Sequence, residues 1–253
     1  MLTNKGRTLK KLVFIILFFS ISLFANTINI AVASNVIYAI DELKKEFNKE
    51  YPHINLRVTL GSSGKLTAQI KNGAPYMLFM SANMKYPNSL YKDGLAITKP
   101  IVYAQGSLAY FSVNSYDFSN GMNLLKSSKI SKIAVANPKS APYGIAAFEA
   151  MKNAGVFDDV KSKFVYGESV SQTISYAMIA TDIGLVAKSA LYSPRMKKYK
   201  KSINWEDVNL SLYKPINQGI VILKDSKDVR SFYDFILSEK AKKIFLNFGY
   251  LVP

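Results

Sequence analysis

The stretch Ile28-Asn-Ile-Ala-Val-Ala-Ser-Asn-Val-Ile-Tyr-Ala-Ile-Asp-Glu-Leu43 decides the fold class of this chain. Its first part, Ile28 to Ala33, is apolar apart from one asparagine and predicts a β-strand. Apolar residues then recur at helical spacing, which indicates a helix with one buried face. These residues are Val36, Ile40, Leu43 and Phe47. A strand that is followed directly by an amphipathic helix is the repeating unit of α/β proteins.

The same unit recurs along the chain, because short β-rich runs alternate with helical patterns. Further strands are predicted at residues 54–60, 77–80, 108–113, 132–136, 164–166, 183–187 and 219–223. Helices are predicted at residues 66–72, 83–94, 142–153, 169–180 and 228–248, the last interrupted at Ser238 and closed by Gly249. The helix at 142–153 is expected to carry Ile145, Phe148 and Met151 on one side. The predicted fold class is therefore α/β.

The N-terminus has the pattern of a secretory signal peptide. Four basic residues precede an apolar run from Leu12 to Phe24 that only two serines interrupt. This run has the length of a signal-peptide core and is short for a bilayer span, which needs about 20 residues. We predict a signal peptide at residues 1–25 with cleavage at Ala25, and hence a periplasmic protein; an uncleaved anchor stays open. The basic residues are Lys5, Arg7, Lys10 and Lys11.

The composition excludes several classes of site. Because the chain has no cysteine, it has no disulfide, no thiolate metal site and no lipid-modified cysteine after the apolar run. The single histidine, His53, excludes a multi-histidine metal centre and argues against a histidine-dependent catalytic triad. The formal charge of +16 falls to about +12 without the signal peptide, which favours the capture of anions. Nucleic acid is not expected as a partner, because the chain is exported.

Four places share one pattern: a strand ends, small or hydroxyl-bearing residues follow, and a helix begins. They are Ala33-Ser-Asn35, Gly61-Ser-Ser-Gly64, Ala141-Pro-Tyr-Gly144 and Gly167-Glu-Ser-Val170. A helix start offers unpaired backbone N–H groups and roughly half a positive charge. Ser34, Ser63 and Ser169 could add hydroxyl groups. If the four turns converged, they would bind a tetrahedral dianion without lysine or arginine, whereas each turn alone is also explained as an ordinary helix cap.

An ordered set of short strings resembles the periplasmic molybdate-binding proteins of ABC transporters, which belong to the type II periplasmic binding proteins. The resemblance covers nearly the whole chain after the signal peptide. The strings are Ala31-Val-Ala-Ser-Asn35, Gly61-Ser-Ser-Gly-Lys-Leu66, Gln69-Ile70, Gly73-Ala-Pro75, Phe79-Met-Ser-Ala82, Asn137-Pro138, Ala141-Pro-Tyr-Gly144, Gly167-Glu-Ser-Val170 and Asp182-Ile-Gly-Leu-Val186.

The resemblance implies two α/β lobes around a ligand cleft, with residues 26–104 plus 218–253 in lobe 1 and residues 105–217 in lobe 2. It implies capture of molybdate, and of tungstate, by a monomer that delivers the oxyanion to an ABC transporter permease. No separate cofactor and no direct ligand to the metal are implied, since the oxyanion itself is held. The implied contacts come from Ser34, Asn35 and Ser63, and from the amides of Tyr143 and Val170.

Two positions depart from the family pattern. Some relatives contribute a tyrosine hydroxyl where this chain has Ala187, so that contact is absent or replaced, with Asn35 as the candidate. Met77 stands where aspartate is common after Gly-Ala-Pro, and we interpret that aspartate as structural.

Alternatives from other classes stay open at this point. A related binding protein could take sulfate or another oxyanion, or a ferric chelate held by some of the sixteen tyrosines. An enzyme is suggested only by Ser62-Ser-Gly-Lys65, which matches the Ser-x-x-Lys signature of penicillin-binding proteins. The accompanying Ser-Asp-Asn and Lys-Thr-Gly motifs are missing from the sequence. We therefore predict a binding protein and not an enzyme.

Overall fold

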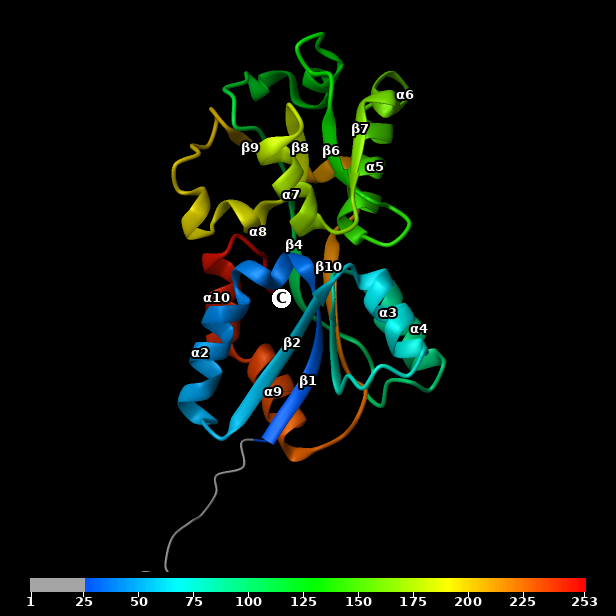
Figure 1. Cartoon of the computed structure of the whole chain (residues 1–253), viewed down its shortest axis with the longest axis vertical. Helices are drawn as coiled ribbons and strands as arrows, with labels where there is room; N and C mark the ends of the chain where they lie inside the picture. Colours follow the sequence, from blue (N-terminus) through cyan, green and yellow to red (C-terminus); the bar gives the residue numbers. More distant parts are fainter. Residues whose placement is uncertain (1–25) are drawn as a thin grey trace, which may run out of the picture.

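The computed structural model describes residues 26–253, so the signal peptide predicted at 1–25 lies outside the described residues. Two five-stranded sheets, each covered by helices, form two lobes that lie one above the other in Figure 1. The prediction of a two-lobed α/β fold is therefore confirmed. Among the described residues, no helix has both the length and the apolar character needed to cross a bilayer.

The lower lobe in Figure 1, called the first lobe, contains both ends of the described chain. Its strands are β1 (Asn26–Ala33), β2 (Ile54–Gly61), β3 (Leu78–Ser81), β4 (Ile101–Gly106) and β10 (Ile216–Ile222), in the order β2-β1-β3-β10-β4. Its helices are η1 (Ser34–Tyr38), α2 (Ile40–Glu50), α3 (Ser63–Lys71), α4 (Lys85–Lys92), α9 (Lys227–Leu237) and α10 (Glu239–Asn247). β1 is parallel to β2 and β3, whereas β10 is antiparallel to β3 and β4.

The second lobe is formed by the middle of the chain. Its strands are β5 (Leu108–Phe111), β6 (Ile133–Ala136), β7 (Phe164–Gly167), β8 (Ile183–Ala187) and β9 (Trp205–Asp207), in the order β7-β6-β8-β5-β9. Its helical segments are η2 (Phe118–Lys126), α5 (Pro142–Asn153), α6 (Phe157–Val160), η3 (Lys161–Lys163), α7 (Val170–Ile179), α8 (Lys188–Leu191), η4 (Pro194–Met196) and η5 (Leu210–Leu212). β4 leads directly into β5 of this lobe, and β10 returns to the first lobe after η5.

The first sheet is buried on both faces. Ile30 and Val32 of β1 belong to a core cluster with residues of α2, α9 and α10, where Phe47 packs against Phe232 with ring centroids 5.1 Å apart. Ala31, between them in sequence, belongs to a second cluster with residues of α3 and α4. Because neighbouring strand residues point to opposite faces, this division explains the continuous apolar run of β1.

Most of the predicted helices and strands are present, but the sequence patterns did not predict the strands β4 and β9 or the helical segments η2, α6, η3, α8, η4 and η5. Two of the predicted helices also differ from the expectation. The helix predicted from Val36 onward begins as the 3-10 helix η1 and becomes α-helical only at Ile40. Helix α5 spans the predicted residues, but Ile145 is 39% exposed, and the buried residues of this helix include Ala147, Ala150 and Met151. The expected apolar side of α5 was therefore wrong at Ile145, because small alanines make the close contacts with the lobe.

Candidate functional site

The register of the first sheet brings the first two turns together. β1 and β2 run parallel, and Ala33 at the end of β1 pairs with Gly61 at the end of β2. Ser34 and Ser62 therefore leave the sheet at the same edge. This is the carboxyl edge, at which open α/β sheets bind their ligands.

The second sheet repeats this arrangement in the other lobe. Ala136 at the end of β6 pairs with Gly167 at the end of β7, and the N–H of Asn137 donates to the carbonyl oxygen of Gly167 at 2.8 Å. After these strands the chain enters α5 and α7, which begin at Pro142 and Val170. Both helix starts therefore lie at the carboxyl edge of the second sheet.

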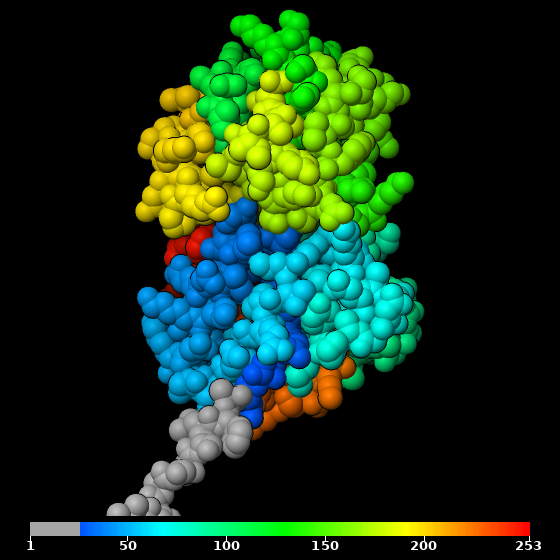
Figure 2. Space-filling view, viewed as in Figure 1, coloured from blue at the N-terminus to red at the C-terminus, as the bar shows by residue number. Residues whose placement is uncertain are grey.

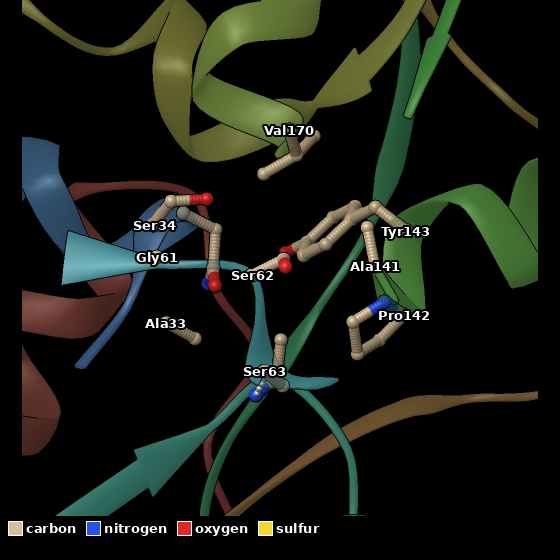
Figure 3. Close-up of a pocket in the computed structure, with 11 residues that line it drawn as sticks. Ala33, Ser34, Gly61, Ser62, Ser63, Ala141, Pro142, Tyr143 and Val170 are labelled. Carbon is tan, nitrogen blue, oxygen red and sulfur yellow. Dashed lines mark hydrogen bonds between the residues drawn. The ribbon is translucent and has the colours of Figure 1, made fainter. Parts of the chain in front are cut away.

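A small pocket lies where these turns meet (Figure 3). All five predicted binding residues line it, namely Ser34, Asn35, Ser63, Tyr143 and Val170. The other lining residues are Ala33, Gly61, Ser62, Ala82, Ala141 and Pro142. Within the described residues 26–253, no lysine, arginine, histidine or carboxylate is part of this lining.

The lining presents hydrogen-bond donors from helix starts. Ser63 and Val170 are the first residues of α3 and α7, and Tyr143 is the second residue of α5. Backbone N–H groups at such positions have no acceptor within their own helix, and a helix start carries roughly half a positive charge. Ser34 and Asn35 open the 3-10 helix η1. The pocket is thus suited to an anion although it contains no cationic side chain.

The Ser63 hydroxyl is held in place by one neighbour. Its Oγ accepts a hydrogen bond of 2.9 Å from the backbone N–H of Ala82. This bond uses the oxygen as an acceptor and leaves the hydroxyl proton free to be donated to a ligand. Because Ser63 is fully buried, its side chain is positioned before any ligand binds.

Ser62 is a lining residue that the sequence reasoning missed. Its side chain is buried, and its Oγ has no hydrogen-bond partner within the described chain. Although Ser62 is the N-cap residue of α3, its side chain makes no capping bond. A buried hydroxyl without a partner is costly, so a polar ligand in the pocket would satisfy it. In sequence, the adjacent serines of Gly61-Ser-Ser-Gly64 gave no signal that distinguishes their roles.

Asn35 lines the pocket, but its side-chain amide is already engaged. Nδ2 donates to Oε1 of Gln218 and to Oη of Tyr250, both at 2.9 Å. Both N–H bonds of the amide are therefore used. The remaining side-chain atom, Oδ1, has no partner in the described chain, but it is an acceptor and cannot donate to an anion. The side chain of Asn35 therefore does not supply the donor that is missing at Ala187, and its backbone N–H is the donor it can offer. Ala187 itself is buried in the core of the second lobe.

Ser169 does not contribute to the pocket. Its Oγ accepts from the N–H of Gln172 at 3.3 Å and lies 3.0 Å from Oγ of Ser171, as expected of the N-cap of α7. The sequence left Ser169 as a possible source of a hydroxyl group, and the pocket lining contains Val170 but not Ser169. Met77 packs against the core of the first lobe, away from the site.

Burial keeps the phenol of the pocket neutral. Desolvation raises the pKa of Tyr143 well above its usual value, and the nearby buried phenols Tyr250 and Tyr103 raise it further. A phenolate is therefore strongly disfavoured at this position. Among the described residues, no group of three or more His, Cys, Asp or Glu could hold a metal ion.

The two lobes touch each other, as the space-filling view shows for one face (Figure 2). The N–H of Gly64 donates to the carbonyl oxygen of Ser140 at 2.9 Å. On the other side, Oγ of Ser189 donates to the carbonyl oxygen of Asn35 at 3.1 Å. An exposed ion pair of 2.6 Å joins Lys65 of α3 to Glu168 before α7. The structure thus has the closed arrangement of the lobes, with the pocket between them.

Comparisons with known proteins agree with this architecture. The model of the family described as bacterial extracellular solute-binding protein matches residues 28–251. The molybdate-binding protein ModA of Azotobacter vinelandii is 31% identical over 89% of this chain and 90% of its own length. ModA of Rhodobacter capsulatus is 33% identical over 87% of this chain and 86% of its own length. The solved structure of the Azotobacter vinelandii periplasmic molybdate-binding protein superposes with a TM-score of 0.80 at 30% identity, over 89% of this chain and 99% of that chain.

Proposed function

Since the chain belongs to the family of bacterial extracellular solute-binding proteins, we propose that its pocket captures molybdate and that the protein delivers this oxyanion to an ABC transporter permease. Family membership also confirms that the chain is a binding protein and not an enzyme. The proposal includes a periplasmic location, tungstate as a second ligand, and action as a monomer. It also includes the lobe boundaries 26–104 plus 218–253 and 105–217, which fall within β4 and β10, the strands that connect the lobes.

The observation that carries the proposal is the convergence of four strand-to-helix turns on one uncharged pocket. Molybdate is a tetrahedral dianion, and the turns offer it backbone N–H groups from both lobes together with the hydroxyls of Ser34, Ser62 and Ser63. Each hydrogen bond to a charged group contributes about 1.5 to 3 kcal/mol. Several such bonds offset the desolvation of the anion, and because they come from both lobes they favour closure.

The alternatives differ in what they require of the pocket. A ferric site built from protein ligands would need several anionic oxygen ligands, whereas the pocket lining contains one phenol, Tyr143, and no carboxylate. Sulfate has the same charge as molybdate but shorter bonds, so that donors fixed for the larger anion would lose contacts with it. The pocket lining therefore favours molybdate or tungstate over both.

Calorimetric titration of the mature protein with molybdate, tungstate, sulfate and ferric ion tests the proposal. We expect tight one-to-one binding of molybdate and tungstate, and weak or undetectable binding of the other two. Replacing both Ser34 and Ser63 by alanine should weaken molybdate binding by about a hundredfold or more, since two donors to a charged group are lost. Ser169→Ala is the matched control, because it removes a helix-start hydroxyl outside the pocket. Preference for sulfate or ferric ion, or equal affinity of the double variant and the wild type, would contradict the proposal.

A further inference from the structure

Five polar side chains form a buried group where the two lobes join, which we call the hinge cluster: Asn35, Tyr103, Tyr143, Gln218 and Tyr250. None is more than 2% exposed. Tyr103 lies on β4 and Gln218 on β10, the two strands at which the chain passes between the lobes. Burying polar groups is costly unless they are hydrogen-bonded to one another. Ligand binding through the lining residues does not explain why Gln218 is polar.

Gln218 makes the central contacts of the hinge cluster. Its Oε1 accepts from Nδ2 of Asn35 and from Oη of Tyr103, each at 2.9 Å. Its Nε2 donates to Oη of Tyr143 at 3.5 Å, the longest contact in the cluster. The register of β10 against β4 shifts between Gln218 and Gly219. Such irregularities commonly re-aim a side chain, and here the side chain points between the lobes.

Two of the three partners of Gln218, Asn35 and Tyr143, lie on opposite sides of the pocket. Asn35 belongs to the binding turn of the first lobe, and Tyr143 belongs to the binding turn of the second lobe. We propose that Gln218 is a positioning residue for the bound anion, because it ties these two turns to each other through the hinge. This inference rests on the proposed function only for the identity of the ligand.

The packing around Tyr143 supports this coupling. A Cβ on Gly106, at the end of β4, would lie 2.0 Å from Oη of Tyr143 and 2.8 Å from Nε2 of Gln218. The phenol therefore reaches directly against the backbone of one crossover strand while it contacts the side chain of the other. A change in the angle between the lobes moves Tyr143 relative to both strands. The contact between Gln218 and Tyr143 can thus form fully only in one relative position of the lobes.

Asn35 is fixed at its other end by the C-terminal segment. Oη of Tyr250 donates to the carbonyl oxygen of Asn35 at 2.9 Å and accepts from its Nδ2 at the same distance. Tyr250 fixes Asn35 to the first lobe, so the hydrogen bond from Asn35 to Gln218 positions the turn that begins at Ser34 as a rigid unit. The backbone N–H groups of that turn then stay aimed at the ligand.

The substitution Gln218→Met tests the proposal, since it keeps the length of the side chain and removes both hydrogen-bonding ends. We measure molybdate affinity by calorimetry and the radius of gyration by small-angle scattering, with and without molybdate. Gln218→Met should lower the affinity about 5- to 150-fold, the loss expected when buried partners are left unpaired. It should also enlarge the ligand-free radius of gyration, while the radius at saturating molybdate stays that of the wild type.

Tyr103→Phe is the matched control, because it removes one bond to the same Oε1 without touching Asn35 or Tyr143. It should lower the melting temperature less than Gln218→Met does, because it removes one of the three bonds of Gln218, and it should leave the affinity within about twofold. In addition, the single variant Tyr143→Phe should lower the affinity. The same change should have little further effect in the Gln218→Met background, because both substitutions break the contact between Gln218 and Tyr143.

The proposal is overturned if Gln218→Met keeps the wild-type affinity and radius, or if both variants lose affinity equally. Failure of the wild type to bind molybdate would instead reject the proposed function, and the ligand-free scattering of Gln218→Met would still test the hinge.

Discussion

The backbone N–H of Gly64 donates a hydrogen bond of 2.9 Å to the carbonyl oxygen of Ser140, and the two residues belong to different lobes. Gly64 follows the pocket residue Ser63 in α3, whereas Ser140 precedes the pocket residue Ala141. The bond therefore joins the binding turns of the two lobes through the backbone, independently of any ligand. Its formation requires the two backbones to approach each other closely.

The substitution Gly64→Ala should block this approach. A Cβ at Gly64 would lie 2.7 Å from Oη of Tyr86, 2.9 Å from the Ser140 oxygen and 3.0 Å from Cα of Ser140. We expect molybdate affinity to fall roughly tenfold or more, because the lobes cannot close fully. Within α3, alanine is a better helix former than glycine by about 1 kcal/mol, so the ligand-free melting temperature should not fall. Calorimetry and thermal unfolding of the same variant check both expectations, and a parallel loss of stability would argue against a closure effect.

The substitution Ser62→Ala should separate ligand binding from stability. The Ser62 hydroxyl has no partner in the described structure, so its removal should leave ligand-free stability unchanged or raise it by about 1 kcal/mol. If the hydroxyl donates to the anion, molybdate affinity should fall about tenfold or more. Ser63→Ala is the comparison, because it also deprives the Ala82 N–H of its acceptor and should lower stability as well. Wild-type affinity of Ser62→Ala would show that this hydroxyl does not contact the ligand.

Local features of the site could be predicted from the sequence, because the signals of a strand end and a helix start lie within a few residues. The turn at Ala141-Pro-Tyr143 is an example, since proline at the first helical position marks the start of α5. The role of Asn35 could not be predicted in this way. Its amide is used by Gln218 and Tyr250, which are 183 and 215 residues away in the sequence. Likewise, only the backbone geometry decides that Ser169 caps its helix while Ser63 faces the pocket.

Molybdate affinity should be nearly independent of pH between about pH 6 and 9, since no lining residue has an ordinary pKa in this range. Burial raises the pKa of Tyr143 well above its usual value of 10.0, so its neutral form persists throughout. Only at a pH above this raised pKa would ionisation of Tyr143 place a negative charge beside the anion and lower the affinity. Calorimetric titrations at several pH values, at constant ionic strength, measure this. A sigmoidal loss of affinity with a midpoint in this range would mean that a charged side chain takes part in binding.

The stability of the second lobe should depend on pH through Asp182, the residue before β8. Burial tends to raise the pKa of this carboxyl group, but hydrogen bonds from the N–H of Lys132 and from the N–H and hydroxyl of Ser131 outweigh burial and lower it. A lowered pKa means that the folded state favours the carboxylate, so the stabilisation is present above the ordinary value of 3.8 and is lost as the pH falls through the lowered pKa.

Asp182→Asn should therefore reduce the free energy of unfolding by about 1 to 2 kcal/mol near pH 7, because charge-assisted hydrogen bonds become neutral ones. The difference between the variant and the wild type should shrink as the pH falls below 3.8, where the wild-type carboxyl group becomes protonated as well. Urea unfolding at a series of pH values measures both curves. Since Asp182 lies outside the pocket lining, molybdate affinity at pH 7 should stay unchanged. A constant difference in unfolding free energy down to pH 2 would mean that the ionised carboxylate is not the source of the stabilisation.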